Sequence, residues 1–263
     1  SLKKVVITGG ANIDNEAFAS CQSITSIELG KGVHSIGYRA FAYCGSLASI
    51  VISENMTGIT GDAFSECGKL TSVNYTGTID QWVQIVGLFA LMSKKTSKKL
   101  FINNELVTEA NITTATKINA YAFRRCESLT SVTIGNSVTE IGSSAFEACS
   151  NLTSVTMGNG VTSTSDYSFK GCQNLKSITI GNSVTEIGYE AFYNCSNLVD
   201  VVIPDSVTKI DSGSFYNCSN LVDVVIPDSV TTISAEAFYN CSSLKTIKIP
   251  DSVTFIGDNA LRG

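Results

Sequence analysis

A fixed period of 23 residues constrains this chain more than any other feature. The stretch FYNCSNLVDVVIPDSVT occurs at 192–208 and again, unchanged, at 215–231. The nine cysteines follow the same period with one longer gap, at 21, 44, 67, 126, 149, 172, 195, 218 and 241. That gap, from Cys67 to Cys126, is 59 residues, or 23 + 36, so one coil is enlarged by 13. An internal repeat of this length is typical of a solenoid.

Each repeat combines a strand pattern, a turn and a short back segment. Around Cys195, the residues Leu198, Val201 and Ile203 have the spacing of a short buried strand, and a Pro-Asp-Ser turn follows at 204–206. The preceding Ile-Gly-x-x-Ala-Phe-x-x-Cys segment spaces its apolar residues three or four apart. This spacing predicts one or two helical turns.

One such unit is too small to fold alone. Ordering its residues costs roughly 1–2 kcal/mol each, whereas burying about eight apolar side chains returns roughly 1.5–3 kcal/mol each. Stacked coils solve this problem, because each side chain packs on its equivalent in the next coil. We therefore expect a repeat solenoid with one parallel β-sheet of about eleven short strands, backed by short helical or irregular segments. It forms a single domain over 1–263, with an enlarged irregular coil at about 76–111.

The composition argues against two classes of partner. A net charge of −5 and a pI near 5.0 do not provide the concentrated basic face that nucleic acid requires. The chain has no run of eighteen apolar residues, so we expect no membrane insertion. Its first residues also lack the apolar stretch of a signal peptide.

The repeat motif resembles that of a known family. Leu-x-x-Val-x-Ile, as at 129–134, is similar to the strand segment of leucine-rich repeats. Ser137 stands where Asn or Cys is usual, however, and the cysteine precedes the strand. With Pro-Asp-Ser-Val-Thr, Ile-Gly-x-x-Ala-Phe and Cys-x-x-Leu, the chain resembles the BspA-type subclass over essentially its whole length. The resemblance implies an extracellular or cell-surface bacterial protein that adheres to host or bacterial partners.

The cysteines and the single histidine predict no catalytic or metal site. Equivalent cysteines on stacked coils have parallel Cβ vectors that suit disulfide geometry poorly, and no two lie closer than 23 residues. We therefore expect buried free thiols. His34 falls in an expected exposed turn, and the sequence has no nucleophile elbow or phosphate loop. We predict a protein without enzymatic activity, cofactor or bound metal.

The enlarged coil departs from the period. Ile79, Trp82, Val83 and Val86 have helical spacing after a Thr78 or Asp80 cap, which predicts a short amphipathic helix. Residues 100–107 then read as a hairpin with a two-residue turn at Asn103-Asn104. Between them lie four lysines that either contact an acidic partner or glycan or form a solvated loop: Lys94, Lys95, Lys98 and Lys99.

A ladder of tyrosines follows the buried phenylalanines at Tyr193, Tyr216 and Tyr239. Their position after a buried residue predicts outward side chains. Stacked exposed aromatic rings can bind a sugar or protein, or can simply cover one another. Both interpretations remain open.

Two neighbouring coils differ from the rest on the outer face of the predicted sheet. The three coils before them carry serine and threonine there, at 131–133, 154–156 and 177–179, whereas the duplicated coils carry Asp200 with Val202 and Asp223 with Val225. This pair either forms a partner site or results from simple copying of one coil. The binding interpretation suits a basic protein segment or a polar chain rather than a small molecule in a deep pocket.

We therefore expect a non-catalytic binding module for a protein or glycan partner. The alternative is a structural spacer that displays another domain and has no ligand of its own. Lysines in the first and last strands, Lys3, Lys4, Lys245 and Lys248, oppose end-to-end pairing, so we expect a monomer.

Overall fold

The computed structural model describes residues 2–10, 12–92 and 96–263. The chain forms two compact units. The N-terminal unit comprises 1–107 with 119–128, and the C-terminal unit comprises 108–118 with 129–263. Each unit is a stack of coils whose strands pair at an offset of 23 residues between regular coils. The single domain over 1–263 stays a prediction.

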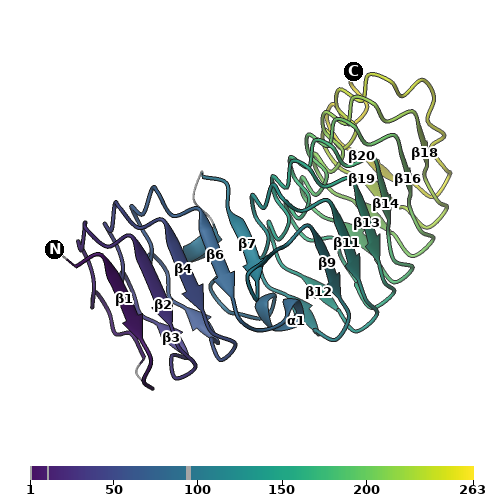
Figure 1. The fold of residues 1–263 in the computed structure, drawn as a ribbon. Coiled ribbons are helices and arrows are strands. Elements are labelled where there is room, and N and C mark those ends of the chain that lie inside the picture. The colour runs from purple at the N-terminus through teal and green to yellow at the C-terminus, as the bar shows by residue number, and fades with distance from the viewer. Residues whose placement is uncertain (1, 11, 93–95) are drawn as a thin grey trace. The chain divides into compact units, whose positions relative to one another are not determined.

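The N-terminal unit contains a six-stranded sheet in the order β1-β2-β4-β6-β7-β8 (Figure 1). Its strands are β1 (Lys4–Ile7), β2 (Ser26–Leu29), β4 (Ser49–Ile52), β6 (Ser72–Tyr75), β7 (Lys99–Ile102) and β8 (Glu105–Leu106). All neighbours are parallel except β7 and β8, which form the predicted hairpin. Asn103 and Asn104 form its turn with φ values of 52° and 68°, because asparagine tolerates the left-handed region that this turn requires.

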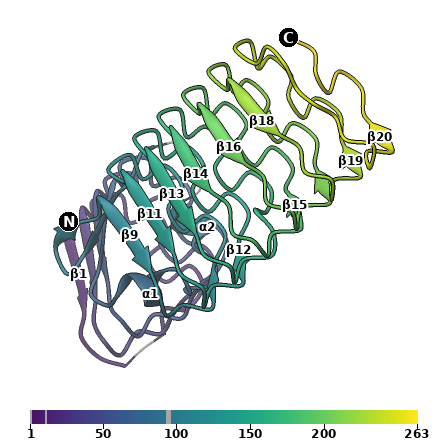
Figure 2. The same ribbon diagram turned by 90° about the vertical axis from the view of Figure 1, so that its right-hand side faces the viewer.

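The C-terminal unit contains a second six-stranded sheet, entirely parallel, whose strands follow one another in chain order (Figure 2). Its strands are β9 (Glu109–Ile112), β11 (Ser131–Ile134), β13 (Ser154–Met157), β14 (Ser177–Thr179), β16 (Asp200–Val202) and β18 (Asp223–Val225). The solenoid of short, mostly parallel strands is confirmed. The strands form two sheets rather than one, because the antiparallel β8 ends the first sheet.

The coils carry a second, narrower set of strands that the sequence did not predict. They are two residues long: β3 (Ser35–Ile36), β5 (Gly58–Ile59), β10 (Lys117–Ile118), β12 (Glu140–Ile141), β15 (Glu186–Ile187), β17 (Lys209–Ile210), β19 (Thr232–Ile233) and β20 (Phe255–Ile256). Where a coil has such a strand, it follows the turn after the main strand; the coil of β13 has only a bridge there, between Ser163 and Glu186. Its isoleucine is buried in all but β20, so it lines the other wall of the core.

The back of each regular coil is a series of turns, so of the two expected alternatives, helical or irregular, the structure has the irregular one. In one coil, Glu190 and Asn194 have φ values of 48° and 60°, which no right-handed helix can contain. The N–H groups of Glu190, Phe192 and Asn194 donate to carbonyls of the next coil, at 2.8–3.0 Å. A spacing of three or four residues between apolar side chains is compatible with this series of turns and also with a helix. The spacing alone therefore does not distinguish the two structures.

Phenylalanine and cysteine ladders fill the core of each unit. In the C-terminal unit the rings of Phe169 and Phe192 stack with centroids 5.5 Å apart and planes 2° apart. The Sγ of Cys44, Cys67, Cys172, Cys195, Cys218 and Cys241 donates to the carbonyl of the Phe 26 residues earlier, as from Cys195 to Phe169 at 3.3 Å. The thiol thus supplies a weak donor to a backbone oxygen inside the core.

The enlarged coil contains two short helices, α1 (Ile79–Trp82) and α2 (Phe89–Met92). The predicted α1 is confirmed, with Thr78 and Gln81 forming a capping box at its start. It ends before Val86, however, whose backbone instead pairs with Gly58 of β5, and its side chain is exposed. The sequence did not predict α2. Within the described residues, neither helix has the length or apolar character to cross a bilayer.

Candidate functional site

The strongest candidate for a binding site is on the sheet of the C-terminal unit, over β16 and β18. These strands pair in register, so Asp200 lies opposite Asp223 and Val202 lies opposite Val225. The two valines are 75% and 70% exposed, unusually high fractions for large apolar side chains. Val201, between Asp200 and Val202, is buried in the core. The strand alternation therefore places the acidic and apolar side chains on one solvent face.

Two further exposed valines adjoin this surface in the chain. Val199 and Val222 precede their strands and are 43% and 49% exposed. We define the Val/Asp patch as Val199, Asp200, Val202, Val222, Asp223 and Val225. Sequence reasoning missed the first valine of each coil, because it considered only the strand residues. The signal was available, since the equivalent residues are Thr130, Thr153 and Lys176 in the preceding coils.

Lysines bracket the patch on both sides along the stack of coils. Lys176 precedes β14 on one side and is exposed. Lys245 and Lys248 belong to the coil after β18 and are also exposed. The patch is therefore an apolar and acidic strip, two coils wide, between basic residues.

The two aspartates of the patch repel each other. Parallel neighbours in a sheet are about 4.8 Å apart, and like charges placed directly opposite cost a few tenths to about 1 kcal/mol. A cation from a partner above Asp200 and Asp223 removes this repulsion. Binding of a cation is therefore favoured by both its attraction and the relief of an existing cost.

A hollow of about 510 Å³ adjoins the patch on the side of the last coil. It lies between β18 and 246–250, where the sheet ladder is reduced to one bridge between Val225 and Lys248. Carboxylates of Asp205, Asp223 and Asp228 are among its lining residues.

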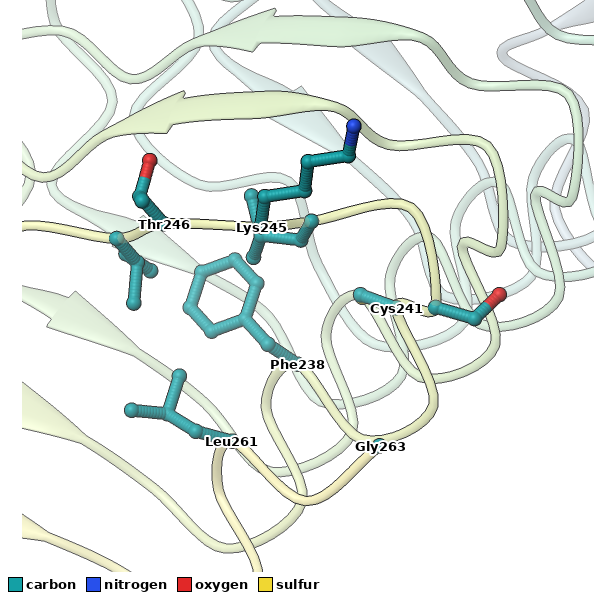
Figure 3. Close-up of a pocket in the computed structure, with 9 residues that line it drawn as sticks. Phe238, Cys241, Lys245, Thr246, Leu261 and Gly263 are labelled. Carbon is teal, nitrogen blue, oxygen red and sulfur yellow. The ribbon is translucent and has the colours of Figure 1, made fainter.

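A second hollow, of about 280 Å³, lies within the last coil itself (Figure 3). The side chains of Phe238 and Leu261 line it, and Leu261 occupies the ladder position of the phenylalanines. The hollow is a gap in the apolar ladder, since leucine is smaller than phenylalanine. It has no cluster of charged groups that would indicate a ligand.

The tyrosine ladder is present, but its ring faces are covered. Tyr193, Tyr216 and Tyr239 are half-buried, and their rings stack with centroids 4.6 and 4.7 Å apart. Lys170 Nζ lies 4.5 Å from the Tyr193 ring centroid, and the Arg262 guanidinium lies 6.0 Å from that of Tyr239. Cations thus cover both ends of the stack. Only ring edges and hydroxyls face solvent, which favours the interpretation that the tyrosines cover one another.

Of the four lysines of the enlarged coil, the structure describes Lys98 and Lys99, and these two do not share an exposed surface. Lys94 and Lys95 lie outside the described residues. Lys98 is buried, and its Nζ donates to the Leu70 carbonyl at 2.6 Å and to Thr96 Oγ1 at 2.7 Å. Lys99 is exposed at the start of β7. The predicted solvated or partner-binding role is therefore wrong for Lys98, whose ammonium is satisfied inside the N-terminal unit.

All nine cysteines are free, and all are buried except Cys21, which is half-buried. Burial raises the pKa of Cys172 and of Cys241 to about 12, because the charged thiolate loses its hydration. The expected buried thiols are confirmed for eight positions. Within the described residues, no three of the Asp, Glu, Cys and His side chains are grouped as metal ligands. His34 is exposed, as predicted, and its Nδ1 lies 3.0 Å from the Asn55 carbonyl oxygen.

Comparison with protein families identifies the repeat. The model of the BspA type leucine rich repeat region matches at 1–85, 94–221 and 139–263, which is nearly the entire chain. The chain belongs to the BspA-type leucine-rich repeat family. Comparison with curated proteins gives no match.

Solved leucine-rich repeat structures share this BspA-type fold. A leucine-rich repeat protein from Bacteroides ovatus is 27% identical with a TM-score of 0.66, and the match covers 97% of this chain and 66% of that one. One from Eubacterium ventriosum is 22% identical with a TM-score of 0.67, covering 100% and 82% of the two chains. The pneumococcal vaccine antigen PcpA is 16% identical with a TM-score of 0.50, covering 98% and 76%. This BspA-type chain thus spans just under two thirds of the Bacteroides ovatus protein.

Proposed function

We propose that this protein is a non-catalytic binding module that holds a macromolecular partner, protein or glycan, on the sheet face of its C-terminal coils. The observation that carries this proposal is the Val/Asp patch. The three preceding strands β11, β13 and β14 present serine and threonine on this face, whereas β16 and β18 present exposed valines and paired carboxylates. Exposing apolar side chains and placing like charges together gains nothing for folding, so the patch is better explained by a partner.

We also propose that the protein acts at the bacterial cell surface or outside the cell, as a monomeric adhesion module. Membership of the BspA-type family and the bacterial leucine-rich repeat structures support this setting. The repeat family is generally a scaffold for binding rather than for catalysis. An extended sheet face with shallow hollows suits a macromolecule better than a small substrate.

A structural spacer remains the second candidate function. The identical stretches at 192–208 and 215–231 favour it, because copying one coil also copies its exposed residues. A spacer has no ligand, so the two functions differ in a direct screen. Purified protein tested against host matrix proteins and a glycan array gives a specific ligand for the binding module and none for the spacer.

The double variant Asp200→Lys with Asp223→Lys tests the location of the site. We expect at least tenfold weaker binding of the ligand found in the screen, because the variant reverses both charges of the patch. Thermal unfolding should change little, since both side chains are exposed. Calorimetric titration measures the affinity.

Ser131→Lys with Ser154→Lys is the matched control for that variant. These residues occupy the equivalent strand positions on β11 and β13 of the same sheet. The control should bind like the wild type. Unchanged affinity in the aspartate variant would place the site elsewhere, first at the tyrosine ladder and next at Lys99 of the enlarged coil.

A further inference from the structure

The acidic side chains of the two duplicated coils lie at two levels, with valine between them. Along one coil the exposed residues are Asp200, Val202 and then Asp205 in the turn, and the next coil repeats them as Asp223, Val225 and Asp228. Parallel pairing in register places Asp200 beside Asp223 and Val202 beside Val225, and the turn residues Asp205 and Asp228 both line the hollow next to β18. The surface therefore presents a carboxylate pair, a valine pair and a second carboxylate pair along the strand direction.

This order matches one face of an extended polypeptide. A strand advances about 3.3 Å per residue, so its residues i, i+2 and i+4 lie on one face and span about 13 Å. Asp200 and Asp205 are five residues apart, at most about 18 Å, and the turn at Pro204 shortens that path. In such a segment, a cation at i can contact the first carboxylate pair and an aliphatic residue at i+2 can contact the valine pair. A cation at i+4 can then contact the second carboxylate pair.

The flanking lysines set the direction in which such a segment runs. A segment crossing the strands must pass Lys176 on one side and Lys245 or Lys248 on the other, and its own cations are repelled there. A segment that follows β16 and β18 meets the carboxylates and valines of these strands along its length. The hollow beside β18 adjoins that path, with Asp223, Val225 and Asp228 among its lining residues and Lys248 of the last coil lining it as well.

We propose that the Val/Asp patch binds an extended basic polypeptide segment of pattern cation-x-aliphatic-x-cation, lying along β16 and β18. This inference rests on the proposed binding function and names its partner class. Arginine is the preferred cation, because its planar guanidinium can donate to two neighbouring carboxylates at once. Its aliphatic stem can also cover the exposed valines.

Two synthetic peptides of identical composition test this pattern. The first is acetyl-Ser-Arg-Ser-Val-Ser-Arg-Ser-amide, and the second, acetyl-Ser-Arg-Arg-Val-Ser-Ser-Ser-amide, has the same charge but the wrong spacing. Titration followed by NMR should show the first binding at least fivefold more tightly, with shifts at the methyls of Val202 and Val225. Replacing both arginines of the first peptide with lysine should weaken it, and raising the salt concentration should do the same.

Protein variants locate the contact. Asp200→Asn with Asp223→Asn, and separately Asp205→Asn with Asp228→Asn, should each weaken the first peptide at least fivefold. Glu109→Gln is the control, because it removes an exposed carboxylate at the equivalent strand position on β9. That variant should bind the peptide like the wild type.

Three results would overturn the inference: equal binding of the two peptides, binding of neither, or equal loss in the Glu109→Gln control. These outcomes are distinct from failure of the proposed function. If the peptides fail while Asp200→Lys with Asp223→Lys still abolishes binding of the screened ligand, the patch binds another class of molecule. If the screen finds no ligand but the first peptide binds as expected, the inference of a basic polypeptide partner is supported. The screen then contained no molecule of that class.

Discussion

Two residues in each regular coil hold a left-handed backbone, which few residue types tolerate well. At the position before each cysteine, φ is 60° at Asn194 and 57° at both Asn217 and Asn240. Asparagine suits this conformation and also links the coils. Asn217 Nδ2 donates to Asn194 Oδ1 at 2.9 Å, and its own Oδ1 accepts from Asn240 Nδ2 at 2.7 Å.

Substitution of Asn217 distinguishes this back from a helix. Asn217→Ala should lower the free energy of unfolding by about 2–3 kcal/mol, because it loses two hydrogen bonds and strains an L-residue at positive φ. Asn217→Gly loses the same bonds without the strain, so it should be about 1 kcal/mol more stable than the alanine variant. Gly171 already occupies an equivalent position with φ of 73°.

Urea unfolding of the two variants gives the sign of this difference. In a right-handed helix the order is reversed, with alanine about 1 kcal/mol better than glycine. An alanine variant more stable than the glycine variant would therefore contradict the left-handed back.

At the scale of single elements, the enlarged coil replaces the regular back with α1 and α2. Trp82 anchors α1, since it is fully buried and its Nε1 donates to the Ala122 carbonyl at 2.9 Å. Between the helices, Gly87 has φ of 82°, and a Cβ on it would lie 1.8 Å from the Ile59 carbonyl oxygen. The coil can therefore close against β5 only with glycine at this position.

Gly87→Ala should destabilise the N-terminal unit by about 3 kcal/mol or more, through the backbone clash and the unfavourable φ. Gly45→Ala is its control, because a Cβ there meets no atom within 4 Å and its φ is not positive. The control should change the thermal midpoint little. Equal midpoints for the two variants would show that β5 and the enlarged coil move apart at little cost.

The sequence predicted the regular parts of these elements and missed the irregular ones for physical reasons. Strand residues such as Val201 follow from alternation, and the cap at Thr78 follows from hydrogen-bonding capacity. The left-handed turns at the back of each coil could not be predicted in this way, because a helix and these turns have the same spacing of apolar residues. Burial of Lys98 was also unpredictable, since it depends on the distant Leu70 carbonyl rather than on any local pattern.

The candidate site was only partly predictable. Sequence alternation placed Asp200, Val202, Asp223 and Val225 on one exposed face, and their register confirms that arrangement. The hollow beside β18 was not predictable, because it arises where the ladder to Lys248 is nearly lost. The shape of this hollow depends on how two neighbouring strands pack against each other, and the sequence of one strand does not specify that packing.

At the scale of the whole molecule, we expect that one coil of 23 residues can be removed without loss of the fold. Deleting residues 196–218 removes 23 residues and joins Cys195 to Ser219, so the remaining coils keep the same types of contact. We expect a cooperative fold with a modestly lower thermal midpoint, because stability in stacked repeats adds by neighbours. Circular dichroism on heating measures it.

A deletion of 196–217, one residue shorter, is the matched control. It leaves one extra residue at the junction, and a shift of one residue moves inward side chains to the opposite face. We expect a lower midpoint and reduced cooperativity for it than for the 23-residue deletion. Identical melting of the two would show that register between coils matters little to this stack.

In every regular coil, backbone N–H groups of the back donate to carbonyls of the next coil, and its carbonyls accept from the coil before, at equivalent positions. A copied coil can therefore form the same hydrogen bonds with both of its neighbours. Recombination between the two identical stretches can therefore lengthen or shorten the protein without a compensating change elsewhere. Each added copy of 200–222 also adds a rung of aspartate and valine to the patch. The valency of the surface, and with it the avidity for a repetitive partner, then becomes a quantity that gene duplication sets directly.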